Sequence, residues 1–210
     1  MRILAVDTCL AACQVAVLDG ERLAAMASEP MERGHQERLA PLASEVMTKA
    51  GLAFTALDRI AVTLGPGSFT ALRVGLAFAK GLGLALRRPV VGLGCLEVLA
   101  EPFAAAPGRT LALLPGRGAA ACSQVFEGGI ALGPSVLVEV AGLDALEPVA
   151  RVVGAAELAD GGLPGAERAP AAFPDPAVLA RMAARREPGR LDPLYMRPPD
   201  ARLPGGRLPE

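Results

Sequence analysis

The sequence contains few of the residues that build metal centres and aromatic binding surfaces. Its 210 residues include no tryptophan, one tyrosine and one histidine. Because a metal site of the H-E-x-x-H type needs two imidazoles, the single His35 excludes that class of site. A catalytic dyad or triad that uses histidine as its base could only use His35. This residue stands in the polar segment 34–38, where a solvated or helix-capping histidine is the more common case.

The four cysteines lack the spacing of a structural zinc site. Cys9, Cys13, Cys95 and Cys122 form no C-x-x-C pair. We therefore expect reduced, buried thiols. A hydrolase that uses a cysteine nucleophile stays open as a rival, with His35 as its one basic partner, and rapid thiol modification at neutral pH would support it.

Strong charge and long uncharged apolar runs are also missing. The formal net charge of -1 argues against a chain that grips a nucleic-acid backbone by itself, so RNA would be met through a partner. The longest apolar segment, residues 69–86, contains Arg73 and Lys80 and is not expected to span a membrane. Met1 and Arg2 lead directly into a short strand-like run, so no signal peptide is expected. These features predict a cytoplasmic protein, and 52% hydrophobic content predicts a sizeable core.

The first half alternates strand and helix patterns. Strands are predicted over residues 2–7, 12–18, 21–28, 59–64 and 89–92, with a hairpin turn at Asp19-Gly20. Helical periodicity covers residues 35–50, with Pro41 predicting a late start or a slight kink, and a further helix is expected over 95–105. The first half therefore opens as a meander and continues as an α/β unit.

A glycine-rich turn opens the second helix. Gly65-Pro66-Gly67-Ser68 precedes a helix whose glycines and alanines form a small-residue face. The turn is either a plain capped strand-to-helix connection or a phosphate cradle or partner surface. It matches neither the P-loop nor the G-x-G-x-x-G fingerprint, so a P-loop NTPase and a dinucleotide-binding fold are not supported.

The second half reads as a smaller unit. Strands are predicted over 110–114, 120–127, 136–140 and near 151–154, a loop over 161–176 and a helix over 176–186. Arg181, Arg185 and Arg186 are expected on the solvated face of that helix, with a minor tRNA contact as the alternative. The tail from Pro198 is rich in proline and glycine, and we expect it to be poorly ordered, at least beyond Leu203.

The element order and several local motifs resemble a known family. Strand, hairpin, strand, helix, strand, helix, strand is the order of the ribonuclease-H-like lobe of actin, Hsp70 and the sugar kinases. Three stretches then resemble the TsaB (YeaZ) family: residues 2–8 (RILAVDT), 65–75 (GPGSFTALRVG) and 193–197 (PLYMR). The resemblance follows residues 1 to about 100 closely and the rest at scattered points. It implies an α/β fold of two ribonuclease-H-like lobes, the second reduced: 1–105, 106–197 and a flexible tail 198–210.

This resemblance implies a scaffold rather than an enzyme. In the family, TsaB is the dimerisation subunit that binds the catalytic paralogue TsaD and works with the ATPase TsaE. The set transfers a threonylcarbamoyl group to adenosine 37 of tRNAs that read codons beginning with A. Applied to this chain, it implies a homodimer in isolation, tRNA contact only through the complex, and no membrane partner.

The resemblance also shows where this chain departs from its active relatives. Cys95 and Leu99 fall where TsaD carries its His-x-x-x-His metal pair, so no metal site is expected. Cys9 replaces the glycine of the superfamily's first phosphate loop, and Pro115-Gly116-Arg117 replaces the common Asp-Ala-Arg. The residues expected to be vestigial and near the nucleotide position are Asp7, Thr8, Gly65, Gly67 and Ser68. ATP or ADP is expected only at the complex interface or on TsaD and TsaE; the alternative function is an ATP-using enzyme of the sugar-kinase superfamily.

The expected partner surface lies on the first two long helices. Its residues are His35, Leu39, Leu42, Val46, Thr70, Arg73, Val74, Gly75 and Phe78. Leu42→Glu or Gly75→Glu is expected to abolish pairing and to leave a folded monomer.

Overall fold

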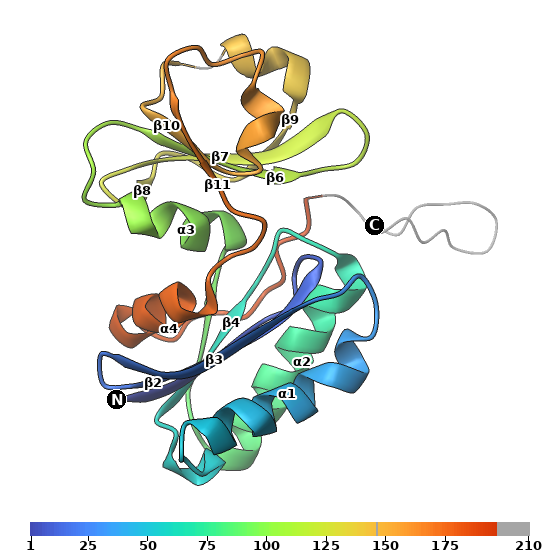
Figure 1. Cartoon of the computed structure of the whole chain (residues 1–210), viewed down its shortest axis with the longest axis vertical. Coiled ribbons are helices and arrows are strands. Elements are labelled where there is room, and N and C mark those ends of the chain that lie inside the picture. Colours follow the sequence, from blue (N-terminus) through green and yellow to red (C-terminus); the bar gives the residue numbers. More distant parts are fainter. Residues whose placement is uncertain (146, 197–210) are drawn as a thin grey trace, which may run out of the picture.

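The computed structural model describes residues 1–145 and 147–196 and contains two β-sheets stacked as two lobes (Figure 1). The first sheet has the order β3-β2-β1-β4-β5. Its strands are β1 (Arg2–Asp7), β2 (Ala12–Asp19), β3 (Arg22–Pro30), β4 (Arg59–Thr63) and β5 (Val90–Leu93). β1 pairs antiparallel with β2 and parallel with β4, as expected for a hairpin followed by a helical crossover.

Alternating side chains on β1 build two cores on opposite faces of this sheet. Leu4 and Val6 belong to one core with α1 (His35–Lys49) and α2 (Phe69–Leu86). Ile3 and Ala5 belong to the other, which is covered by α4 (Pro176–Arg185). The first sheet is therefore covered on both faces by α-helices.

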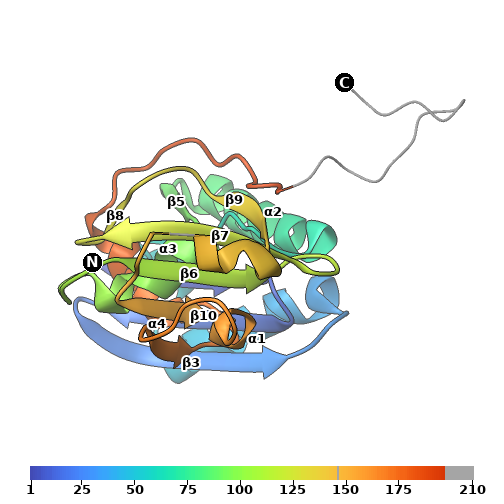
Figure 2. The same ribbon diagram turned by 90° about the horizontal axis from the view of Figure 1, so that it is seen from above.

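The second sheet has the order β11-β10-β6-β7-β8, with β9 also paired to β7 (Figure 2). Its strands are β6 (Thr110–Pro115), β7 (Ala120–Glu127), β8 (Ile130–Ala131), β9 (Val136–Glu139), β10 (Arg151–Gly154) and β11 (Glu167–Pro170). One face packs on α3 (Cys95–Ala100), and the other lies under two short 3₁₀ helices, η3 (Val140–Ala145) and η4 (Ala156–Ala159). The remaining 3₁₀ turns of the described chain are η1 (Phe54–Ala56) and η2 (Glu101–Phe103).

The helices α3 and α4 lie between the two sheets, each packed on the sheet of the other half of the sequence (Figure 1). Leu179 and Met182 of α4 pack against Ile3 and Val91 in the first lobe. Leu96 and Leu99 of α3 pack with strands of the second lobe. The expected boundary at residue 105 therefore needs correction, because residues 176–185 complete the first lobe rather than the second.

Several local expectations also change. Helix α1 begins at His35 and includes Pro41, so the late start is wrong. Helix α3 ends at Ala100, where the 3₁₀ turn η2 with its proline follows, rather than at 105. β11 lies inside the expected loop 161–176, because its short polar sequence carries no strand pattern. The expected flexible tail, residues 198–210, and Arg197 of the 193–197 motif lie outside the described residues.

Candidate functional site between the lobes

A cavity of about 900 Å³ lies between the two lobes. The first lobe contributes residues 9–11 after β1, the glycine-rich turn 66–69 and the start of α1. The second lobe contributes residues 114–117 at the end of β6, and the segment 195–196 closes one side. The cavity therefore lies where the carboxyl ends of the two central strands, β1 and β6, face each other.

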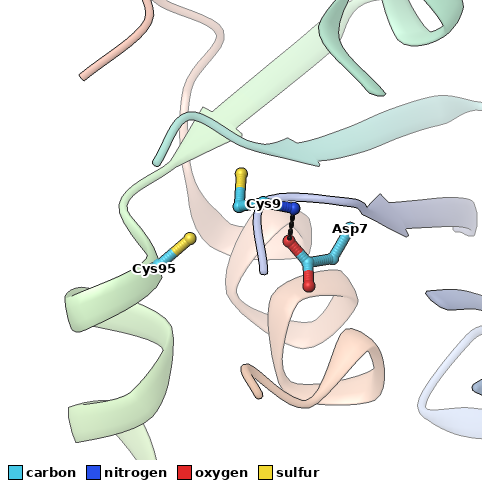
Figure 3. A group of neighbouring side chains, drawn as sticks. All are labelled: Asp7, Cys9 and Cys95. Carbon is cyan, nitrogen blue, oxygen red and sulfur yellow. Dashed lines mark hydrogen bonds between the residues drawn. The ribbon is translucent and has the colours of Figure 1, made fainter. Parts of the chain in front are cut away.

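Asp7 lies at the floor of this region and is fully buried (Figure 3). Its Oδ1 accepts hydrogen bonds from the Cys9 backbone N–H, at 3.1 Å, and from the Thr63 hydroxyl. Its Oδ2 accepts a hydrogen bond from Gln14 Nε2 at 3.0 Å. Burial raises the pKa of Asp7 above its ordinary 3.8, although these hydrogen bonds act in the opposite direction. The carboxylate thus has donors on both oxygens and joins β1, β2 and β4.

Two thiols lie next to this carboxylate. The ligating atoms of Asp7, Cys9 and Cys95 all lie within 4.8 Å of one another (Figure 3). In the described chain this is the one grouping of such side chains with the spacing to hold a metal ion. Burial raises the pKa of the Cys95 thiol well above its ordinary value, which disfavours the thiolate that metals bind. The expectation of no metal site stays a prediction.

The glycine-rich turn is pressed against the loop that follows β1. A Cβ added to Gly67 would overlap the carbonyl of Cys9. The Ser68 N–H donates to that same carbonyl at 2.7 Å, and the Ser68 side chain accepts from the Ala71 N–H at the start of α2. This amide at the α2 N-terminus therefore serves the fold rather than a phosphate.

Helix α2 is fixed to β1 through Thr8. The Thr8 hydroxyl donates to the Ala71 carbonyl at 2.6 Å and accepts from the Gly75 N–H at 3.2 Å. A Cβ on Gly75 would lie 2.6 Å from the Thr8 Oγ1. Gly75 is thus a glycine because β1 approaches the helix here, and it is not free to form a partner surface.

The expected partner residues divide into two groups. His35, Leu39, Leu42, Val46 and Gly75 are buried inside the chain. Their expected role in direct partner contact is corrected, because the apolar stripe of α1 is already used against the sheet. Thr70 and Arg73 are exposed, and Val74 and Phe78 are half-buried, so these four remain available.

Sequence reasoning missed a cluster at the start of α2. The Arg73 guanidinium lies 3.6 Å from the centre of the Phe69 ring, and its Nε donates to the Tyr195 hydroxyl at 2.8 Å. The Leu194 N–H also donates to the Leu64 carbonyl at 2.7 Å. The presence of Arg73 and Tyr195 in two separate motifs was the available signal, but their pairing depends on the chain return after α4.

Comparisons with known proteins agree with this architecture. The family model described as tRNA N6-adenosine threonylcarbamoyltransferase, TsaD, matches residues 27–169. The tRNA threonylcarbamoyladenosine biosynthesis protein TsaB of Escherichia coli is 37% identical over 101 residues. That alignment covers 48% of this chain and 43% of the relative, so the chain spans less than half of that protein's length.

Longer matches extend over both lobes. An uncharacterised protein of Mycobacterium bovis is 33% identical over 205 residues, which cover 95% of this chain and 93% of that protein. A Pseudomonas aeruginosa structure described as similar to peptidase YEAZ superposes with a TM-score of 0.79 at 25% identity, covering 93% and 99% of the two chains.

A dehydratase activator of Clostridium difficile, solved with ADPNP, superposes with a TM-score of 0.51 at 10% identity, covering 87% and 94%. This likeness concerns the fold alone, an α/β fold of the actin, Hsp70 and sugar-kinase kind. With the family model, the TsaB relative and the YeaZ-like structure taken together, the chain belongs to the TsaB (YeaZ) family.

Proposed function

We propose that this chain is a non-catalytic scaffold that binds TsaD, and works with TsaE, in forming N6-threonylcarbamoyladenosine at adenosine 37 of tRNA. The chain acts in the cytoplasm, forms a homodimer when alone and meets tRNA only through the complex. The family it belongs to is one of tRNA threonylcarbamoyladenosine biosynthesis, which supports the pathway. The scaffold role needs a separate argument from the surface of the molecule.

The exposed face of α2 is the observation that carries this proposal. Its outward residues are Thr70, Arg73, Ala77, Gly81 and Leu84. Leu84 is 83% exposed, and no atom lies within 4 Å of a Cβ added to Gly81. An apolar helix face with small residues lets the backbone of a second helix approach closely. α1 lies beside α2 on the same side of the sheet, so the two helices offer a platform for a helical bundle (Figure 1).

The chemistry around Asp7 supports a subunit without catalysis of its own. A sugar-kinase-like enzyme needs an acidic residue that positions metal-bound water beside a phosphate loop. Here Asp7 has no exposed surface and already accepts three hydrogen bonds. The contact between Gly67 and Cys9 fills the space where a phosphate loop would open. These contacts weigh against the alternative ATP-using enzyme.

The test is light scattering behind size exclusion, on the chain alone and mixed with TsaD from the same organism. We expect a homodimer alone and a heterodimer in the mixture. Leu84→Glu and Gly81→Glu are expected to abolish both, because each places a charge in the buried centre of the bundle. Ile130→Glu is the matched control, since Ile130 is 70% exposed on the second lobe.

Circular dichroism separates loss of binding from loss of folding. Leu84 and Gly81 are exposed, so both variants should melt close to the unmodified chain. A monomer that ignores TsaD would contradict the scaffold proposal. Unchanged assembly of both variants would show that another surface is used.

A further inference from the structure

The cavity between the lobes has the size and lining of a ligand site. Its volume of about 900 Å³ falls within the range typical of small-molecule pockets, ~300–1,000 Å³. Neither the proposed scaffold role nor the contacts around Asp7 use this space. We propose that it binds a small amphipathic anion, with one carboxylate or phosphate group on an apolar body.

The polar part of the lining is mostly cationic. Arg73 and Arg117 both line the cavity, and Glu32 is the one carboxylate among the described lining residues. The Arg73 guanidinium is held in place by Phe69 and Tyr195. A guanidinium has five N–H donors, and the bond to Tyr195 uses only one, so others can meet an anion.

A buried imidazole also points to a missing partner. His35 lines the cavity, is 5% exposed, and has no hydrogen-bond partner at Nε2. Such a group is costly unless something pairs with it. His35 also begins α1, whose N-cap residue, Gly34, provides no side-chain cap. The first N–H groups of a 15-residue helix thus favour an anion at the same end of the cavity.

The remaining lining is apolar. Leu114, Leu137 and Met196 face the cavity together with the rings of Phe69 and Tyr195. A purely inorganic anion would leave this surface uncovered, whereas a chain or ring attached to the charged group would bury it.

The floor of the cavity disfavours a magnesium-bound nucleoside triphosphate. The Cys9 carbonyl accepts the Ser68 N–H, and the adjoining loop presents Leu10 and Ala11. Asp7 lies below, with donors on both of its oxygens. The site therefore suits one anionic group better than a polyphosphate with its metal.

The test uses 8-anilinonaphthalene-1-sulfonate, a fluorescent aromatic anion, as the probe on the full chain. We expect one probe bound per chain, displaced by octanoate or by adenosine monophosphate. The stronger of these two competitors distinguishes a carboxylate from a phosphate ligand. Neutral octanol and inorganic phosphate should each compete at least about tenfold more weakly, because each lacks one half of the recognised chemistry.

Two variants address the cavity itself. Leu137→Trp should narrow it, since Leu137 is a 38% exposed lining residue, and His35→Phe removes the imidazole nitrogens but keeps a ring. Each is expected to weaken the probe about tenfold or more. The controls Ile130→Trp and Leu84→Glu, both outside the lining, should leave the probe affinity unchanged.

If His35→Phe fails to fold, Leu137→Trp alone decides. Unchanged probe binding in Leu137→Trp would overturn the proposal, as would displacement by octanol as strong as by octanoate. Much tighter competition by magnesium ATP than by adenosine monophosphate would also overturn it, in favour of a triphosphate site. None of these outcomes depends on binding to TsaD, so this proposal and the proposed function can fail separately.

Discussion

The two lobes share one strand arrangement but differ in what covers it. In each lobe a central strand, β1 or β6, pairs antiparallel with the next strand and parallel with a later one, β4 or β10. In the first lobe, α-helices of 15 and 18 residues follow β3 and β4. In the second lobe, the corresponding connections hold 3₁₀ helices of six and four residues. Only the first lobe thus carries long helices with one face on the core and another toward solvent.

The loops after the two central strands differ in the same direction. After β1, Asp7 ties three strands together through hydrogen bonds. After β6, Pro115 and Gly116 make a tight turn in which the Gly116 N–H donates to the Ala120 carbonyl at 2.9 Å. The comparison teaches that the first lobe keeps both the polar network and the association surface, while the second supplies a wall of the cavity.

The largest expected effect comes from a charge inside the first lobe. Leu42 is 1% exposed and packs in the core between α1 and the sheet. Leu42→Glu should lower the free energy of unfolding by about 4 kcal/mol or more, because an unpaired carboxylate would be buried. Urea denaturation followed by circular dichroism measures this loss.

Ser44→Glu is the matched control on the exposed side of the same helix and should change stability by less than about 0.5 kcal/mol. A folded Leu42→Glu monomer that no longer pairs would contradict this expectation. It would restore the original interpretation of Leu42 as a partner residue, and α1 would then lie off the sheet.

Most of the first lobe could be predicted from its sequence, because period-two strands and a period-3.6 helix are local signals. The same stripe of Leu39, Leu42 and Val46 fits a core or a partner equally well, and only the position of the sheet decides between them. The role of Gly75 was equally hidden, since Thr8 is distant in the sequence.

The second lobe was harder to predict. β11 is polar and four residues long, and it is held by parallel pairing with β10 rather than by its own pattern. The cavity depends on three segments far apart in the sequence, so the residues around 9, 115 and 195 carried no joint signal.

A smaller effect separates two glycines on α2. Gly75→Ala should destabilise the chain by ~1–3 kcal/mol, because its Cβ would press on the Thr8 hydroxyl at 2.6 Å. Gly81→Ala, with open space around its Cβ, should stabilise it by about 0.5–1 kcal/mol. Combining Gly75→Ala with Thr8→Ala should recover part of the loss, since the clashing oxygen is gone. Thermal or urea denaturation of the four variants gives the coupling, and equal effects at Gly75 and Gly81 would show that α2 does not rest on β1.

The smallest effect concerns Asp7, the acid that the second lobe lacks. Because burial raises the pKa of Asp7, the folded chain holds this proton more tightly than the unfolded chain. The stabilising contribution of the protonated form is therefore fully present below the unfolded pKa of about 3.8 and is lost as pH rises through the folded pKa. Asp7→Asn cannot titrate, and its amide would face Gln14 Nε2, which costs about 1 kcal/mol at low pH if Gln14 must turn. Urea denaturation across a pH series should show the unmodified chain losing stability relative to Asp7→Asn as pH rises. A difference that instead grows in favour of the unmodified chain would mean that its hydrogen bonds outweigh burial, so that Asp7 is held as a carboxylate.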